Sequence, residues 1–414
     1  MKETIKNIYD FVDNKFYFKL LYLFVSLTFV TMLKEVPGIK ILNYIALAWG
    51  IILILLMIIE DYKRRKIYKF DIPLGIFVIL TLVLNIIDYK SIENFKIWMV
   101  NLILIITIFT VDVFRSKKDI IKEMNIITYF YAIFMFIASS TSLAMKFFEI
   151  KIKIRDVVFE FNGIKGGIFE NKNALSIAAA LAIVMCIYLN CVAKTHRLKM
   201  FCITNIILQT ITMIDVTMIG EHGRSAFLIV IAVVYIFIFV YNKNKYFRII
   251  FLLIPILICG VFLTYKDNIR DFTSGRSSLW TSAAIVIQEY PLTGVGNNDL
   301  IEAVKGARET DDLPGLELGG LHNIYVQTAT VNGIISLLLF IVFIGMILMF
   351  IVQHLDKLKR KEKFKMTTLT SLIVGILAVN LFESTLIYIV SFISMIFWIY
   401  LGYLVSILDN KNID

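Results

Sequence analysis

The stretch GLHNIYVQTATVNGIISLLLFIVFIG, residues 320–345, joins a polar loop to a long apolar run. A run of about 20 apolar residues has the length that a helix needs to cross a bilayer. Such runs recur along the 414-residue chain, which is 59% hydrophobic and 18% charged, with a mean hydropathy of +0.80. A soluble protein could not hide this much apolar surface. Because the runs show no strand-like alternation, the sequence predicts an all-α polytopic membrane protein rather than a barrel.

The apolar runs define twelve expected transmembrane spans. They lie at 16–34, 39–59, 70–88, 96–114, 124–148, 173–193, 199–219, 225–241, 248–265, 325–352, 366–385 and 387–408. The first nineteen residues carry both charge signs and lack the short basic start of a cleavable signal peptide. We therefore expect the first apolar run to stay in the membrane.

Basic clusters occupy every second gap between these spans. They read DYKRRKIYK, RSKKDIIK, KTHRLK, NKNKYFR and KLKRKEKFK. By the positive-inside rule, this alternation predicts that both termini are cytoplasmic. The formal net charge of +10 then reflects topology and attraction to anionic lipid, and it does not indicate nucleic-acid binding.

Two sizeable loops fall on the opposite, outer face. One covers 149–172, and the other covers 266–324 with nine acidic and five basic residues. Long loops in a compact chain are usually functional. Since no internal repeat or low-complexity segment divides the chain, we expect one transmembrane domain over 1–414 with an outer elaboration.

No cluster of residues indicates a metal ion or a cofactor. The four cysteines lie inside apolar runs without metal spacing. The glycines of PLTGVGNNDL, residues 291–300, permit a tight turn. No predicted strand precedes them, so they do not indicate a dinucleotide site.

TSGRSSLWTSAAIVIQEYP, residues 273–291, is predicted to form a short amphipathic helix at the membrane interface, with its apolar face toward lipid or the helix bundle. Thr273 or Ser274 can cap its start, and Pro291 ends it. Its expected apolar face consists of Leu279, Trp280, Ala283, Ala284 and Ile287. Arg276 lies in the first turn, where the helix macrodipole disfavours a cation. The conflict disappears if Arg276 and free amide groups jointly face a phosphate; the alternative is a solvated arginine.

Three further ionisable residues lie at or near the outer membrane boundary. Arg224, in GEHGRSAFL (220–228), is either functional or a snorkelling side chain. Asp215 and Glu383 lie at membrane depth, where a charge needs a partner or serves a pathway. Pairing of either carboxylate with Arg224 or Arg276 is therefore the structural alternative to a direct functional role.

The four histidines divide between the two faces. His196 and His354 fall in the cytoplasmic basic segments, whereas His222 and His322 are expected outside. A histidine that is neutral near pH 7 can act as a general base. Considered alone, each of the outer two fits a surface residue better than a catalyst.

Four segments, taken in order, resemble the O-antigen ligase and polysaccharide polymerase family of bacterial envelopes. They are GGIFENKNALSIAAAL (166–181), GRSAFL (223–228), GRSSLWTSAAIVIQEYPLTGVG (275–296) and HNIYVQTATVNGIISLLLF (322–340). The resemblance covers about 166–345, which is less than half of the chain. Each segment is loose alone, and their order, spacing and common sidedness give the resemblance its specificity.

The resemblance implies an integral glycosyltransferase with a GT-C-like fold, placed in the bacterial cytoplasmic membrane and active on its extracytoplasmic face. Its donor would be a glycan on undecaprenyl diphosphate. The family's two key arginines correspond to Arg224 and Arg276, and its outer-loop histidine corresponds to His322. Serine often precedes the first arginine in the family, and Gly223 stands there in this chain. Asn323, beside the histidine, is expected to contact the substrate.

These residue types suit that chemistry. Negative charge builds on the diphosphate as it leaves, and arginine is always charged and binds phosphate in a bidentate manner. A sugar hydroxyl is a poor nucleophile until a base takes its proton, and His322 is the candidate base. We therefore expect a transferase that needs neither a metal nor a cofactor.

The resulting prediction is a surface-polysaccharide polymerase, for O-antigen or capsule, that transfers a growing glycan from undecaprenyl diphosphate to a lipid-linked repeat unit. A ligase that transfers glycan to lipid A core or another acceptor is the alternative within the family. A flippase or transporter of lipid-linked oligosaccharide is a third reading, which would favour repeat-related halves and a charged central pathway. Expected partners are the lipid-linked oligosaccharide, membrane lipid, and the chain-length regulator and flippase of the pathway, with no nucleic acid.

Overall fold

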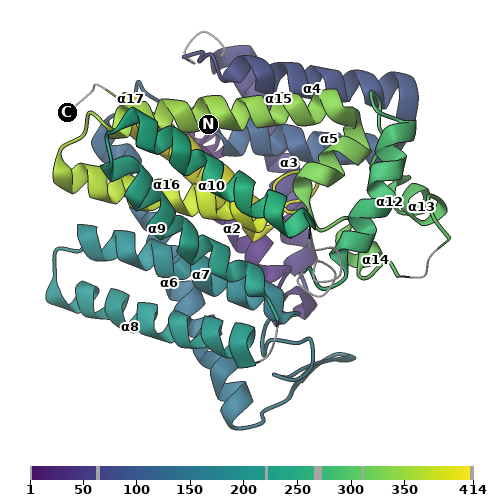
Figure 1. Cartoon of the computed structure of the whole chain (residues 1–414). Coiled ribbons are helices and arrows are strands. Elements are labelled where there is room, and N and C mark those ends of the chain that lie inside the picture. The colour runs from purple at the N-terminus through teal and green to yellow at the C-terminus, as the bar shows by residue number, and fades with distance from the viewer. Residues whose placement is uncertain (1, 62–65, 220–221, 265–272, 310–311, 411–414) are drawn as a thin grey trace.

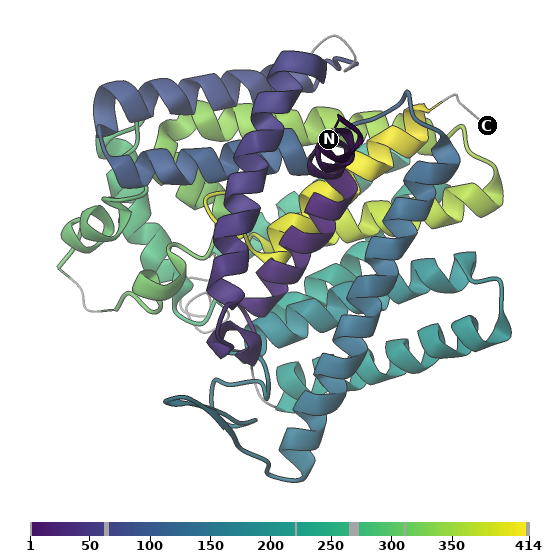
Figure 2. The ribbon, with the colours of Figure 1, turned by 180° about the vertical axis from the view of Figure 1, so that it is seen from behind.

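The computed structural model of the chain describes residues 2–61, 66–219, 222–264, 273–309 and 312–410. This part is built from helices packed into a bundle, with one small hairpin (Figures 1 and 2). Eight of its helices are long and apolar enough to cross a membrane. The chain is therefore a multi-pass membrane protein, as the apolar runs predict.

Helices coincide with every predicted span. In chain order they are α2 (Lys15–Thr28), α3 (Ile39–Leu56), α4 (Asp71–Leu84), α5 (Ile92–Ile103), α6 (Lys117–Phe147), α7 (Lys172–Val192), α8 (His196–Ile214), α9 (Phe227–Tyr241), α10 (Lys245–Thr264), α15 (Ile324–Leu355), α16 (Arg360–Val379) and α17 (Phe392–Asp409). Helix α1 (Lys2–Val12) precedes them. Helices α2, α5, α10 and α16 are not among the eight that are long and apolar enough to cross a membrane. The count of twelve transmembrane spans therefore stays a prediction.

Short turns of other helical types extend several of these elements. Turns of π-helix follow α3, α4, α5 and α8 as η2 (Met57–Asp61), η3 (Asn85–Tyr89), η4 (Leu104–Ile108) and η5 (Asp215–Ile219). Turns of 3-10 helix form η1 (Met32–Glu35) after α2 and η6 (Arg224–Ala226) before α9.

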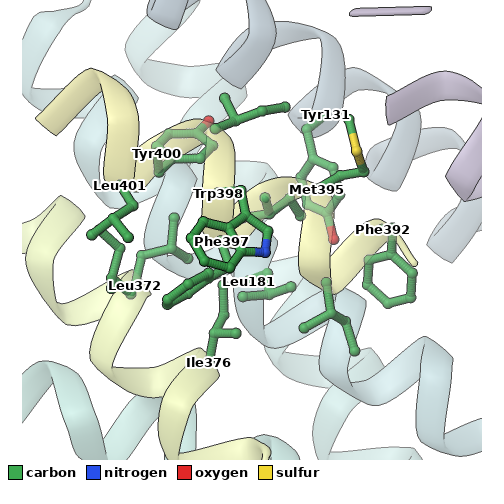
Figure 3. Packing of buried hydrophobic residues seen from close by; sticks show 14 of the residues in the cluster. Tyr131, Leu181, Leu372, Ile376, Phe392, Met395, Phe397, Trp398, Tyr400 and Leu401 are labelled. Atoms are coloured by element: carbon green, nitrogen blue, oxygen red, sulfur yellow. The ribbon is translucent and has the colours of Figure 1, made fainter. Parts of the chain in front are cut away.

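Helix α17 lies at the centre of the bundle. All its residues from Phe392 to Ile407 are buried, as expected for a helix that is apolar on nearly every side. Figure 3 shows its Trp398 and Tyr400 among side chains from α6, α7 and α16. The buried indole N–H of Trp398 donates to the carbonyl oxygen of Leu386 at 3.0 Å. This packing anchors the segment before α17 to the core.

The chain between α16 and α17 departs from the sequence-based spans at 366–385 and 387–408. Helix α16 ends at Val379, α17 begins at Phe392, and the link 380–391 is not helical. Within the link, the Asn380 side-chain oxygen accepts the backbone N–H of Thr385 at 2.9 Å. The predicted end of the 366–385 span is wrong because a local side-chain bond replaces the next helical turn.

The expected outer loop 149–172 contains the exception to an all-α architecture. Strands β1 (Ile152–Ile154) and β2 (Val157–Phe159) form an antiparallel hairpin, with Ile152 opposite Phe159. Both views place this hairpin at the end of the bundle that lies away from the C-terminus (Figures 1 and 2).

The described part of the expected loop 266–324 folds into a helical cap. The cap contains α12 (Arg276–Glu289), α13 (Leu300–Gly306) and α14 (Leu316–Gly319), whereas 266–272 and 310–311 lie outside the described residues. A small separate core joins the cap to α15, and it is formed by Leu279, Ala283, Val286, Leu300, Val304, Leu316 and Leu321 of the cap and by Val331 of α15. The cap lies at the same end of the bundle as the hairpin (Figures 1 and 2).

Helix α12 confirms the helix predicted at 273–291, but its N-cap is neither of the two residues expected. The N-cap is Gly275, with φ +81°, and the Thr273 hydroxyl instead accepts the N–H of Ser277 at 3.1 Å. Val286 is buried, whereas Ala284 of the expected apolar face is exposed. The helix packs against α13 and α15, so its apolar face lies against protein rather than lipid.

A cysteine in place of Gly306 tests the predicted sidedness. Gly306 ends α13, is exposed, and has open space where a side chain would be added. In a background without the four native cysteines, Gly306→Cys in intact cells should react with a membrane-impermeant maleimide. The control, Lys359→Cys, lies at the exposed turn before α16 and should react only after the cells are opened. The reverse labelling pattern would overturn the predicted orientation.

Candidate functional site

Glu383 joins two of the residues that the sequence singles out. Its Oε1 lies 3.3 Å from Nη2 of Arg276, and its Oε2 lies 3.6 Å from Nδ1 of His322. A second guanidinium nitrogen of Arg276 donates to the carbonyl oxygen of Phe382. The three ionisable side chains are 13–17% exposed. The expected pairing of Glu383 with Arg276 is thus confirmed, and its contact with His322 is a new finding.

Three separate elements bring these side chains together. Arg276 is the first residue of α12, His322 directly precedes the N-cap of α15, and Glu383 lies in the link 380–391. The link is bonded to the start of α15, because Ile324 N–H donates to the carbonyl oxygens of Asn380 and Glu383 at 3.0 and 3.1 Å. The site therefore depends on contacts between residues more than fifty positions apart.

The backbone around His322 is fixed on both sides. The Leu321 carbonyl oxygen accepts the indole N–H of Trp280 at 2.9 Å, and the Asn323 N–H donates to the Ser384 hydroxyl at 3.0 Å. Between them, His322 has a φ of +47°, in the left-handed region that few non-glycine residues adopt. Backbone strain of this kind clusters at functional sites and persists only where the surroundings impose it.

The two ring nitrogens of His322 face different neighbours. Nδ1 is buried on the side of Glu383 and has no hydrogen-bond partner among the described residues. Nε2 faces Gly315, where an added Cβ atom would lie 2.9 Å from it. Gly315 also has a φ of +73°, so this position favours glycine twice over. Because glycine has no side chain, the Gly315 backbone can lie close to the imidazole without a clash.

The helix starts at this site do not offer free amide groups. The N–H groups of Arg276, Ser277 and Ser278 donate to the Thr273 carbonyl, the Thr273 hydroxyl and the Gly275 carbonyl. At α15, the Asn323 side-chain oxygen accepts the N–H groups of Tyr325 and Val326. The expectation that Arg276 and free amides jointly face a phosphate is wrong for the amides, because local caps already use them.

Asn323 thus has a structural task. Its side-chain oxygen caps α15, and the residue is buried.

Among the described residues, no group of three or more His, Cys, Asp or Glu side chains is arranged to hold a metal ion.

Arg224 is not part of the Glu383 cluster. It is exposed and begins η6, after Gly223 in the left-handed region with φ +64°. The Gly223 backbone lies against Ser176 near the start of α7, and the Ser176 hydroxyl donates to the Gly223 carbonyl at 3.1 Å. In the part of the chain that the structure describes, Arg224 has no ion pair with a carboxylate. Since α7, α9 and α15 start at one end of the bundle, Arg224 shares that end with Arg276.

Asp215 has a different partner from those expected. Its carboxylate pairs with Lys146, near the end of α6. Of the two carboxylates considered as partners for Arg224 or Arg276, Glu383 therefore pairs with Arg276, whereas Asp215 pairs with a lysine. The sequence did not reveal Lys146 as the partner because it lies 69 positions away from Asp215, near the end of the neighbouring helix α6.

The glycine turn in 291–296 inserts into a break in α15. At Gly333 the helix has φ +80° and ψ 168°, which interrupts its regular hydrogen bonding. The N–H groups of Val295 and Gly296 donate to the carbonyls of Thr330 and Val331 at 3.0 and 2.9 Å. In return, Ile334 N–H donates to the Pro291 carbonyl at 2.8 Å. The turn thus satisfies the backbone groups that the break would leave unpaired in a membrane protein.

This insertion fixes α12, which carries Arg276, against α15, which follows His322. We expect Gly333→Ala to lower the stability of the purified protein by roughly 2–4 kcal/mol, because the added Cβ meets the Leu292 carbonyl and alanine is strained at this φ. The midpoint of thermal unfolding in detergent measures this loss. Gly345→Ala, in the same helix with open space for a Cβ, is the control and should leave the midpoint unchanged or slightly raised. Equal midpoints for both variants would contradict the proposed role of the inserted turn.

Comparison with known families bears on the same residues. Residues 208–341, about a third of the chain, match the family model described as O-antigen ligase. No curated protein matches the sequence. The match supports the O-antigen ligase and polymerase family for this chain. It contains Arg224, Arg276 and His322, whereas Glu383 lies beyond its end.

Proposed function

We propose that the chain transfers a glycan from a lipid diphosphate to a sugar hydroxyl at the end of the bundle that carries the cap. The observation that carries this proposal is that Arg276 and His322 both lie next to Glu383. The first two residues belong to the region that matches O-antigen ligases, and Glu383 follows it in the chain. A fixed cation and a histidine are the two groups that this reaction requires. No nucleotide sugar is involved.

In the proposed step, the bond between the anomeric carbon and the diphosphate oxygen breaks, and its electron pair stays on the diphosphate. The acceptor hydroxyl oxygen forms the new bond to that carbon and gives its proton to His322. Arg276 stabilises the negative charge that builds on the leaving group. Attack from the face opposite the diphosphate inverts the configuration at the donor carbon.

Glu383 supports both partners of this step. It holds the guanidinium of Arg276 in one orientation through Oε1. Its Oε2 lies close to the buried Nδ1 of His322, and a movement of a few tenths of an ångström would give a hydrogen bond. Once His322 has taken a proton, the carboxylate lies beside the positive charge of the imidazolium. Glu383 is therefore a positioning residue that also favours proton transfer to His322.

Glu383→Gln tests this role. It keeps the size of the side chain but removes its charge, so we expect the transfer rate to fall by ~10–10²-fold, a typical effect on a group that orients a catalytic base. If Glu383 acts only through His322, the double variant with His322→Ala will be no slower than His322→Ala alone, and any further loss measures its action through Arg276. Additive losses would mean that Glu383 acts independently of the histidine. Unchanged unfolding midpoints would exclude a general loss of structure.

The proposed acceptor is a second lipid-linked repeat unit, which makes the protein a polymerase for O-antigen or capsule. Such a reaction brings two lipid diphosphates to one face of the membrane. Exposed Arg224, which lies outside the Arg276 cluster, provides a second cation for the second diphosphate. The description of the matched family favours the other candidate, a ligase whose acceptor is lipid A core or another glycan.

Purified protein with a single lipid-linked repeat unit distinguishes these acceptors. A polymerase forms a ladder of longer lipid-linked glycans from this one substrate. A ligase forms product only after lipid A core or another acceptor is added. The third candidate, a flippase, predicts neither product but movement of the intact lipid-linked unit across proteoliposomes. Failure to form any glycosidic bond with all these acceptors would overturn the transferase proposal.

A further inference from the structure

A second candidate site lies at the opposite end of the bundle. A cavity of about 1290 Å³ opens where α2, α4 and α6 begin and where α3 and α17 end. This end lies away from the cap (Figures 1 and 2). Pockets for small molecules commonly measure about 300–1,000 Å³, so a sizeable ligand can fit.

One wall of this cavity is apolar and open to the side. It is formed by Met57 and Ile58 after α3, by Leu74, Val78 and Ile79 of α4, and by Ile105 of η4. Ile58 and Ile79 are 61% and 64% exposed, which on a membrane helix means exposure to lipid. A hydrocarbon chain can therefore enter the cavity between α3 and α4 without leaving the bilayer.

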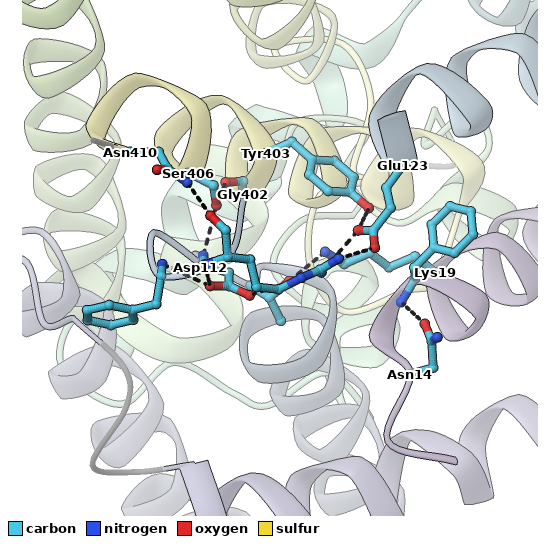
Figure 4. Close-up of polar contacts among 12 residues, drawn as sticks. Asn14, Lys19, Asp112, Glu123, Gly402, Tyr403, Ser406 and Asn410 are labelled. Atoms are coloured by element: carbon cyan, nitrogen blue, oxygen red, sulfur yellow. Dashed lines mark hydrogen bonds and ion pairs between the residues drawn. The ribbon is translucent and has the colours of Figure 1, made fainter. Parts of the chain in front are cut away.

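The other wall is polar, and its main ion pair is internal (Figure 4). Arg115 donates to both oxygens of Glu123 at 2.5 and 3.3 Å, and the Tyr403 hydroxyl lies 3.4 Å from the same carboxylate. Asp112 accepts the backbone N–H groups of Phe114 and Arg115 at 3.2 Å. These carboxylates are thus occupied by other donors.

Lys19 is the cation in this wall that lacks such a partner. It is only 3% exposed, and its ammonium donates to the Thr110 hydroxyl at 2.5 Å and lies 4.5 Å from the centre of the Tyr403 ring. The carboxylates of Glu123 and Asp112 act on Lys19 electrostatically, but each accepts hydrogen bonds from other donors, and among the described residues neither forms an ion pair with it. An ammonium has three donors, and a buried charge is costly unless it is paired. The cavity therefore presents an unpaired cation beside an apolar slot.

We propose that this cavity binds one phospholipid, with its phosphate on Lys19 and its hydrocarbon chains against α3 and α4. An amphiphile matches both walls, whereas a free anion would leave the apolar wall unused. The cavity is lined by five acidic side chains, Asp10 and Asp13 among them, and by three basic ones, Lys15, Lys19 and Arg115. The excess of acidic side chains favours a headgroup that carries an amine, such as phosphoethanolamine, over a purely anionic one. The site is separate from the transfer site, and the proposal does not depend on the transfer reaction.

Two variants address the two halves of the site. Lys19→Met removes the charge and keeps an unbranched side chain of similar length. Gly75→Leu fills the apolar half, because Gly75 lines the cavity and an added Cβ there meets no atom within 4 Å. Lys69→Met is the matched control, since Lys69 is exposed at the same end and does not line the cavity.

The test measures lipid binding to the delipidated full-length protein by native mass spectrometry, with phosphatidylethanolamine as the probe. We expect one tightly held lipid per chain, a loss of at least ~10-fold in affinity for Lys19→Met, as for a charge-assisted hydrogen bond, and a similar loss for Gly75→Leu. The Lys69→Met control should bind as the wild type does. Melting in detergent, with and without lipid, checks that each variant is folded.

Several outcomes would overturn the proposal. Wild-type affinity in both Lys19→Met and Gly75→Leu would show that the lipid binds elsewhere. Equal protection of the protein by inorganic phosphate alone would assign the cation to a soluble anion. Tighter binding of phosphatidylglycerol than of phosphatidylethanolamine would contradict the role given to the acidic side chains.

Discussion

Replacing His322 by alanine is expected to lower the rate of glycan transfer by ~10²–10⁴-fold, a typical loss for a general base. The imidazole is the only proposed acceptor for the proton of the attacking hydroxyl, and its strained backbone and buried Nδ1 hold it beside Glu383. The measurement is formation of product from a lipid-linked repeat unit by purified protein. In cells, lipid-linked single units should accumulate on the outer leaflet while the protein still inserts.

Two further variants separate catalysis from positioning. His322→Gln retains a hydrogen-bonding side chain but cannot take up a proton, so it should be nearly as slow as His322→Ala. His222→Ala is the control, because His222 is the other histidine that the sequence predicts on this face and has no proposed role in the reaction, so it should retain most of the activity. Substantial activity in His322→Gln would mean that the residue binds or orients substrate and is not the base.

Replacing Arg276 by alanine is expected to lower transfer by ~10²–10³-fold, the usual cost of losing one group that stabilises transition-state charge. Arg276→Lys should recover only part of the activity, because lysine keeps the charge and loses the planar fork. Glu383 would also lose its partner, so the loss should appear mainly in the rate of the chemical step. Single-turnover transfer with saturating lipid-linked donor measures that step directly.

Arg308→Ala is the matched control for Arg276→Ala. Arg308 binds α12, the helix that begins with Arg276, through 2.8–2.9 Å hydrogen bonds to Ser278 and Ser282, and no contact of Arg308 with Glu383 is present among the described residues. Its loss should affect stability more than transfer. Near-normal product from Arg276→Ala at matched protein level would mean that Arg276 has a structural role only.

We also expect Arg224→Ala to lower transfer by ~10²-fold, as for the second cation of the reaction.

The sequence by itself determined the class of the fold and the residues to examine. Hydrophobic runs long enough for a bilayer are a local property, so each predicted span coincides with a helix. The short helix at 273–291 was likewise visible, because helical spacing and Pro291 are local signals. Arg224, Arg276 and His322 were found through segment order and resemblance, which also need no knowledge of contacts.

Only the tertiary structure decided which of these residues meet. Arg276 and His322 both lie next to Glu383, and Arg224 lies outside this cluster. Asp215 forms its ion pair with Lys146. The tertiary structure also showed that the turn after Pro291 completes the hydrogen bonds of a helix broken at Gly333. Such pairings form because buried charges and backbone groups must find partners in an environment that excludes water. The partner that serves can lie anywhere in the chain, so the packing of the helices, and no local pattern, selects it.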